Sequence, residues 1–87
     1  MIVISSRQFK KKVTKLPKNI RAALKERLRL FLENPHHPVL NNHPLHGSLR
    51  NYRSINITGD YRMVFEGYTT TTIRLIDIDT HDHLYDS

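Results

Sequence analysis

The chain contains no cysteine, only three glycines and no long hydrophobic run. The absence of cysteine excludes disulfide bonds, a thiolate nucleophile and any cysteine-containing zinc site, and it fits a reducing compartment. The longest apolar runs, such as MIVI and LRLFL, are a few residues long, so we expect no membrane span, no signal peptide and no membrane partner. We therefore expect a cytoplasmic protein. Gly47 and Gly59 stand singly, which excludes a glycine-rich phosphate loop.

The chain has 87 residues, which predicts one small domain over residues 1–87. Lysine and arginine number 14 against 8 acidic residues, and the formal net charge is +6. Residues 7–29 hold ten of these basic side chains and a single acid, Glu26, whereas residues 73–87 are acidic. Such a basic region attracts polyanions, or it is simply the solvated face of a helix. Composition leaves these two interpretations open.

Hydrophobic periodicity predicts a strand followed by two helices. The β-branched run MIVI is typical of a strand buried on both faces. Ser5 and Gln8 have the spacing of a capping box, and the apolar residues Phe9, Val13 and Leu16 that follow lie on one helical face. Pro17 ends this helix and can begin a second one, whose apolar stripe is Ile20, Ala23, Leu24, Leu28 and Phe31. These two helices form a basic hairpin that should lie on a sheet.

The second half of the chain has the period of β-strands. Residues 35–50 are rich in proline and histidine and show no sustained period, so they are expected to be a connecting loop. The alternating segments RSINI, YRMVFE and TTIRLIDID then predict a three-stranded antiparallel meander with a central last strand. A three-residue turn at residues 58–60 would place Ile55 opposite Met63 and Asn56 opposite Arg62.

Several side chains could serve phosphodiester cleavage of RNA. In that reaction the ribose 2′-hydroxyl attacks the adjacent phosphorus, a base and an acid move protons, and a cation stabilises the phosphorane. The residues that could converge at one end of the sheet for this purpose are His43, Asp60, Arg62, His81 and Tyr85. Tyr85 could stack on an unpaired base or donate its hydroxyl. The reaction requires no metal or other cofactor.

Each of these residues also has a purely structural interpretation. His43 precedes a proline and could be a turn residue, Arg62 could pair with Asp77 or Glu66 across the sheet, and His81 could orient the tail. The tripeptide HDH at residues 81–83 invites a metal site, but neither H-x-x-x-H nor H-E-x-x-H occurs. We therefore expect no metal.

Three segments carry a resemblance to a known family. HPLHGSLRNYRS, GDYRMVFE and IRLIDIDTHDHLYDS, in that order after a basic helical pair, resemble the RelE/ParE superfamily of bacterial type II toxins, and within it the YafQ-like and RelE-like messenger-RNA interferases. The resemblance implies an α/β (α+β) fold of the RelE type: an N-terminal strand and a basic helical hairpin packed on an antiparallel sheet of about four strands. It also implies ribosome-dependent endoribonuclease activity on messenger RNA in the decoding site, and neutralisation by a cognate antitoxin.

The resemblance implies particular site residues. The functional positions of YafQ-like members match His43, Asp60, Tyr61, His81 and Tyr85. The functional positions of RelE-like members match Arg62 and, again, Tyr85. YafQ-like members have a further histidine where this chain has Asn56, which cannot act as a general base. The ParE branch poisons DNA gyrase on the same scaffold, so a gyrase inhibitor or a protein that only binds its antitoxin is the alternative.

The basic residues are the expected RNA contacts. Arg50 and Arg53 would hold the RNA backbone. The basic helices would dock on ribosomal RNA, with Lys11 and Lys12 among the side chains that contact it. An acidic, amphipathic antitoxin segment could lie across the same surface, giving a toxin–antitoxin hetero-oligomer.

Overall fold

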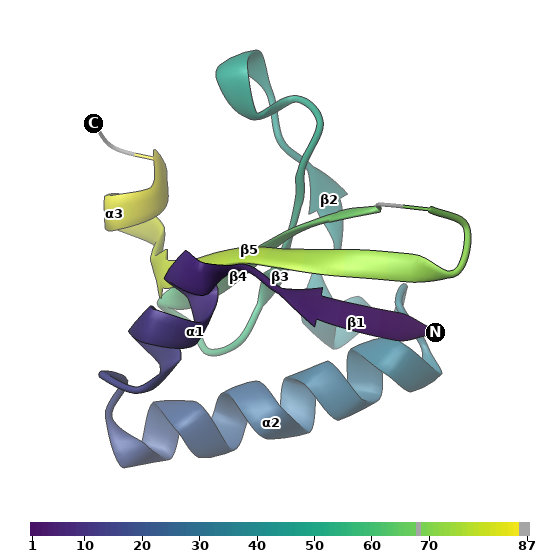
Figure 1. The fold of residues 1–87 in the computed structure, drawn as a ribbon. Helices are drawn as coiled ribbons and strands as arrows, with labels where there is room; N and C mark the ends of the chain where they lie inside the picture. Colours follow the sequence, from purple (N-terminus) through teal and green to yellow (C-terminus); the bar gives the residue numbers. More distant parts are fainter. Residues whose placement is uncertain (68, 86–87) are drawn as a thin grey trace.

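The computed structural model describes residues 1–67 and 69–85 (Figure 1). Its elements follow one another in the order β1 (Ile2–Ser5), α1 (Arg7–Val13), α2 (Lys18–Glu33), the 3₁₀ turn η1 (Pro38–Leu40), β2 (His43–Pro44), the 3₁₀ turn η2 (Gly47–Leu49), β3 (Arg53–Asn56), β4 (Tyr61–Gly67), β5 (Thr72–Thr80) and α3 (His81–Tyr85). The strands form one sheet in the order β1-β5-β4-β3-β2. Figure 1 shows α2 across one side of this sheet, with η2 and α3 rising on the other side. The predicted α+β fold is confirmed, although the sheet has five strands rather than about four.

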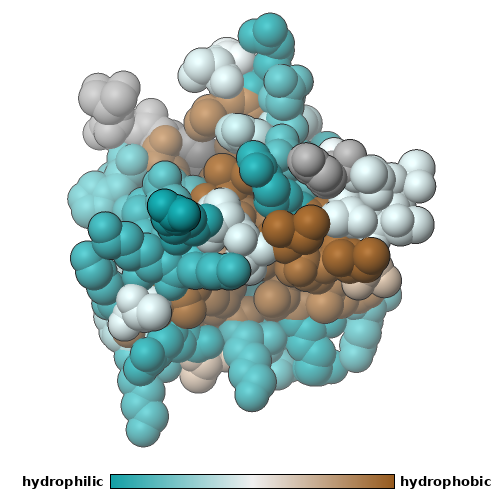
Figure 2. Space-filling model, viewed as in Figure 1, coloured by the Kyte–Doolittle hydropathy of each residue, from teal (hydrophilic) through white to brown (hydrophobic). Residues whose placement is uncertain are grey.

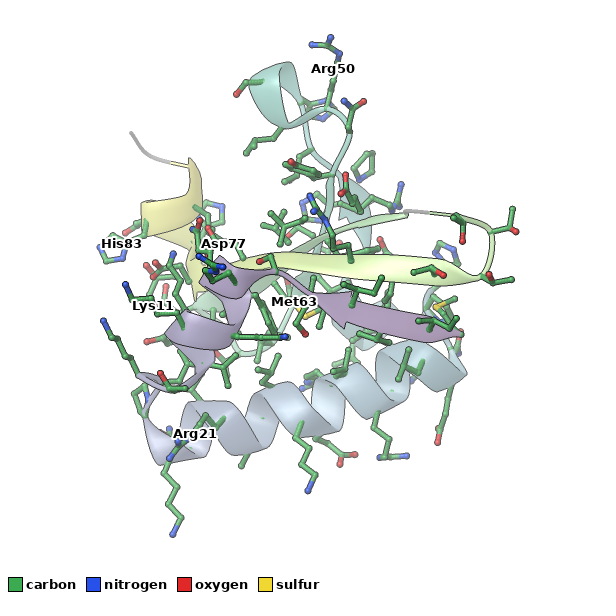
Figure 3. The ribbon with its side chains drawn as sticks, in the orientation of Figure 1. Lys11, Arg21, Arg50, Met63, Asp77 and His83 are labelled. Atoms are coloured by element: carbon green, nitrogen blue, oxygen red, sulfur yellow. The ribbon has the colours of Figure 1, made fainter. Side chains whose placement is uncertain are left out.

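The core lies between α2 and the sheet. The helix buries the predicted stripe: Ile20, Leu24 and Phe31 are buried, and the partly buried Ala23 and Leu28 pack against the core cluster. The rings of Phe31 and Phe65 meet edge to face with their centroids 4.8 Å apart. Figure 3 shows Met63 between the sheet and α2, where its side chain is fully buried. Because α2 covers this face of the sheet, a functional site can lie only on the opposite face or at the edges.

The meander has the predicted register. Ile55 pairs with Met63 and Asn56 with Arg62 across the β3–β4 hairpin, and β5 lies centrally between β1 and β4. The β4–β5 ladder has an irregularity at Val64 and Phe65, which pair with Asp77 and Leu75 and so leave Ile76 as an extra residue. Beyond the end of β1, α1 takes its place beside β5, because the Ser6 amide donates a hydrogen bond of 2.9 Å to the Leu75 carbonyl.

The prediction that the first strand is buried on both faces was wrong. β1 is an edge strand that pairs in parallel with the first part of β5 only. Its Ile2 and Ile4 side chains are 60% and 43% exposed, while Val3 packs against the core. Figure 2 shows this hydrophobic surface over β1, above the hydrophilic surface of α2. An apolar run therefore did not distinguish a central strand from an edge strand.

The expected helix cap is shifted by one residue. Ser6, not Ser5, is the N-cap of α1, and its hydroxyl oxygen accepts a hydrogen bond of 3.0 Å from the Phe9 amide. The same hydroxyl donates to the Ile76 carbonyl at 2.8 Å, so the cap also ties α1 to β5. Gln8 donates to Asp77 at 3.2 Å instead of completing a capping box.

The histidine-rich segment is more ordered than a plain connecting loop. It contains η1, the two-residue strand β2 and η2, and β2 adds the fifth strand by pairing with β3. Buried Leu40 and Leu45 anchor it to the body of the protein. Within the described residues, no helix is both long enough and apolar enough to span a membrane.

Candidate active site

A cavity of about 240 Å³ lies between the η2 segment and the start of α3, lined by His43, Pro44, Leu45, His46, Leu49 and His81. The sequence predicts that His43 and His81 converge, and the structure brings them to the same cavity although they belong to β2 and α3. Three imidazoles therefore line one open space. Histidine is the side chain best suited to proton transfer near neutral pH.

The orientation of His43 is fixed by the backbone. Its Nδ1 lies 2.7 Å from the carbonyl oxygen of Asn41. A carbonyl oxygen only accepts, so Nδ1 carries the proton and Nε2 is left with a free lone pair in the neutral ring. Asn41 presents this carbonyl from a left-handed conformation with φ 47°. The result is an imidazole that can accept a proton through Nε2.

His81 is positioned by the β3–β4 turn. Its backbone amide donates a hydrogen bond of 2.8 Å to the carbonyl oxygen of Asp60, so α3 begins beside that turn. The His81 side chain is about half exposed, and its Nδ1 lies 3.8 Å from Oδ1 of Asp82. The carboxylate of Asp60 is on an exposed residue and does not line the 240 Å³ cavity among the described residues.

Arg62 is held by the turn that it follows. Its Nη1 donates to the carbonyl oxygens of Thr58, Gly59 and Tyr61, each at 3.1 Å. The expected pairing of Arg62 with Asp77 or Glu66 is not seen among the described residues, since Asp77 pairs with Lys12 and Glu66 pairs with Arg74. Arg62 thus stabilises the turn beside His81. It is not among the described residues that line the cavity of His43 and His81. The side chain of Tyr85, the fifth predicted catalytic residue, lies outside the described part of the chain.

Asn56 lies in a different place from the histidine pair. It lines a separate cavity of about 210 Å³ together with Arg27, Val39 and the 58–59 turn. Its Oδ1 is buried and has no hydrogen-bond partner among the described residues. Asn56 is therefore absent from the lining of the His43–His81 cavity.

Some of the predicted RNA contacts are exposed to solvent, and others contact residues of the protein itself. Lys11 and Arg50 are on exposed residues, and Figure 3 shows Arg50 projecting beyond η2 and Lys11 on the outside of α1. Arg53 instead donates to Oδ1 of Asn42 at 2.8 Å and braces the loop before β2. Tyr61 lines a third cavity, of about 190 Å³, with Lys12 and Lys15.

Lys12 belongs to an ion-pair network that sequence reasoning missed. Its Nζ lies 2.8 Å from Asp77 and 3.0 Å from Asp79, and Asp79 is also 3.0 Å from Nδ1 of His83. Burial lowers the pKa of Lys12, but the hydrogen bonds and charges of both aspartates outweigh it and raise that pKa above its ordinary value. Burial likewise raises the pKa of Asp79, but hydrogen bonds from Lys12 and His83 outweigh it and lower that pKa. The network joins α1, β5 and α3.

Sequence reasoning also left out His46 as a site residue. The signal was present in the segment HPLHG, where His46 follows His43 closely. Within the described residues, no group of three or more potential ligands is arranged to hold a metal ion. The arrangement can move protons and, with nearby exposed cations, hold a phosphate.

Comparisons with known proteins assign the family. The family model for the ParE toxin of type II toxin–antitoxin systems, parDE, matches residues 3–85. The chain belongs to this toxin family. No curated protein is significantly similar to it in sequence.

Solved structures support the assignment. The toxin resembles YafQ from Escherichia coli strain BL21(DE3), with 26% identity, a TM-score of 0.80 and coverage of 95% of this chain and 96% of that one. It also resembles a chain in the E. coli DinJ–YafQ toxin–antitoxin complex, with 28% identity, a TM-score of 0.73 and coverage of 95% and 94%. The YoeB/ParE toxin from Agrobacterium tumefaciens shares the fold at 16% identity, with a TM-score of 0.77 and coverage of 93% and 99%.

Proposed function

We propose that this toxin is a ribosome-dependent endoribonuclease that cleaves translated messenger RNA in the ribosomal A site without a metal. The observation that carries the proposal is the single cavity lined by His43 and His81. A toxin that acted only by binding would have no need to bring imidazoles from β2 and α3 together. The similarity to YafQ over almost the whole chain supports the same conclusion.

The chemistry follows from the orientation of His43. Its Nε2 takes the proton from the ribose 2′-hydroxyl as that oxygen forms a bond to phosphorus. The bond from phosphorus to the 5′ oxygen then breaks, and the leaving oxygen takes a proton from a second acid, which leaves a 2′,3′-cyclic phosphate and a free 5′-hydroxyl. His81 lines the same cavity and would donate a hydrogen bond to the phosphate, where negative charge develops.

The other predicted residues take supporting roles. Arg62 holds the turn whose Asp60 carbonyl positions His81, so both residues would act on the geometry of the site. Lys11 and Arg50 are exposed and would contact RNA phosphates, whereas Lys12 and Arg53 position α1 and the loop before β2. Tyr61 and Tyr85 would stack on bases.

The natural partner would be an antitoxin, as in the DinJ–YafQ complex that one similar structure describes. The exposed basic side chains of α1 and α2 would attract an acidic segment. Figure 3 shows one of them, Arg21, pointing away from the sheet. Bound there, an antitoxin would cover the surface that we assign to ribosomal RNA and so prevent docking.

The test is primer extension on a reporter messenger RNA in a reconstituted translation reaction, with and without ribosomes. We expect discrete cuts that need ribosomes.

His43→Gln should lower the cleavage rate about 100- to 10,000-fold, since it removes one general base. His81→Ala should lower it about 100- to 1,000-fold, since it removes one donor to the developing charge. His36→Ala, at an exposed position outside the cavity, is the matched control. Intact messenger RNA in both reactions would contradict the proposal.

Gyrase inhibition is the second candidate, and the match to the ParE family model is the observation that favours it. A gyrase inhibitor would induce the DNA-damage response while messenger RNA stays intact, and His43→Gln would leave its toxicity unchanged. Rapid loss of messenger RNA before any DNA damage would exclude it.

A further inference from the structure

The cavity holds a third imidazole, that of His46, for which the described part of the chain shows no structural task. His46 is the residue before η2, and its side chain makes no capping hydrogen bond there. Its imidazole has no hydrogen-bond or ion-pair partner among the described residues, and the residue is exposed. Both ring nitrogens are therefore available to a ligand, whereas Nδ1 of His43 is occupied by the Asn41 carbonyl.

The backbone on both sides of His46 is fixed. Leu45 is buried, and its amide donates to the Tyr52 carbonyl at 3.0 Å, which closes the loop. The His46 carbonyl accepts from the Leu49 amide at 3.2 Å. Gly47 follows with φ +65°, a conformation that other residues adopt only with strain. The backbone that carries this imidazole is therefore held in place at the wall of the cavity by the chain around it.

We propose that His46 is a further catalytic residue of this toxin, the acid that protonates the leaving 5′ oxygen. The assignment rests on the proposed endoribonuclease function. In the imidazolium form, one ring N–H of His46 gives its proton to the 5′ oxygen as the P–O5′ bond breaks and that oxygen keeps the electron pair. The neutral His46 then regains a proton from solvent, to which it is exposed. His43 correspondingly releases to solvent the proton that it took from the 2′-hydroxyl.

The proposal explains how the chain manages without a histidine at position 56. Asn56 cannot transfer a proton, and it lines another cavity. His46 adds a further proton-transfer group to the cavity that contains His43 and His81. A pair with one neutral and one protonated imidazole is the arrangement that gives a bell-shaped dependence of rate on pH.

The test compares the wild-type toxin with His46→Ala, His46→Gln and the control His36→Ala in the ribosome reaction between pH 5 and 9. We expect both His46 variants to cleave about 100- to 10,000-fold more slowly and to lose the fall in rate at high pH, because that fall reports deprotonation of the acid. Thermal unfolding of each variant should match that of the wild type, since the imidazole has no partner in the described structure.

The outcomes are distinct. Cleavage by His46→Ala at a rate within a few fold of the wild type would overturn the assignment and leave the endoribonuclease function standing. A slow His46→Ala variant that keeps the high-pH fall, or recovery of activity in His46→Gln, would also overturn it, because His46 would then only hold the phosphate. A wild-type toxin without ribosome-dependent cleavage would overturn the proposed function, and the assignment with it.

Discussion

Lys12→Met offers a direct test of how α1 is held against the sheet. The methionine keeps the aliphatic stem but removes the charge that lies 2.8 Å from Asp77 and 3.0 Å from Asp79. Exposed ion pairs contribute about 0.2 to 1 kcal/mol, and breaking a buried pair costs about 3 to 5 kcal/mol. The Lys12 side chain is 33% exposed and the two aspartates 20% and 25%, so this network falls between those limits. We expect Lys12→Met to lower the free energy of unfolding by about 1 to 3 kcal/mol.

The assay is thermal and urea unfolding followed by circular dichroism, with Lys11→Met as the matched control on an exposed neighbour. In a domain of this size about 1 kcal/mol shifts the melting temperature by about 4 to 8 °C, so the expected loss is easily measured. The Lys11 variant should stay within about 0.5 kcal/mol of the wild type. Equal stabilities of the Lys11 and Lys12 variants would refute the view that this network stabilises the fold.

The pH dependence gives the same test a second, independent readout. The pKa of Asp79 is lowered in the folded protein. Its contribution to stability is therefore present above the unfolded-state pKa and is lost as the pH falls through the folded-state pKa. The raised pKa of Lys12 means that its contribution is present below the unfolded-state pKa and is lost as the pH rises through the folded value. The difference between wild type and Lys12→Met should therefore be largest between about pH 5 and pH 10 and should shrink outside that window.

Two further predictions concern the loop that carries the histidines. Gly47→Ala should destabilise the toxin by about 1 to 2 kcal/mol because φ is +65°, whereas Gly59→Ala, which has open space around it and no positive φ, should be nearly neutral in the same unfolding assay. Asn41→Ala, at φ 47°, should cost a similar amount and slow RNA cleavage by disturbing the carbonyl that orients His43, and Asn41→Gly should recover the stability. Equal unfolding curves for the alanine and glycine variants at position 41 would contradict this account of its strain.

The elements that sequence predicted well are those whose periodic pattern is long. The stripe of α2 from Ile20 to Phe31 extends over about three turns, and its members are buried or packed against the core, because the helix has only one apolar face to bury. The hairpin register was equally determined, since a slip of one residue would have moved Ile55 out of the core. The two-residue strand β2 is too short to show any period, so the loop concealed the fifth strand.

The parts of the site that sequence missed depend on contacts between distant elements. Asp79 and His83 are four residues apart, but the first belongs to β5 and the second to α3, so neither a strand period nor a helix period relates them. Lys12 looks like any other lysine of a basic helix until the fold places it between two aspartates. His43 and His81 converge only because α3 starts beside the turn at Asp60.

The contacts of Asp79 give the acidic end of the chain a role in the geometry of the candidate active site. Asp79 accepts hydrogen bonds from Lys12 of α1 and from His83 of α3, and α3 begins with His81. The position of His81 therefore depends on two attachments: the Asp60 carbonyl, which accepts from the amide of His81, and the contact of Asp79 with His83, two residues along the helix. Because the second attachment is shared with the basic helix α1, a partner that draws Lys12 away from Asp79 would weaken the hold on α3. The charge asymmetry between the two ends of the sequence is thus, in part, an internal contact that helps to place one of the imidazoles.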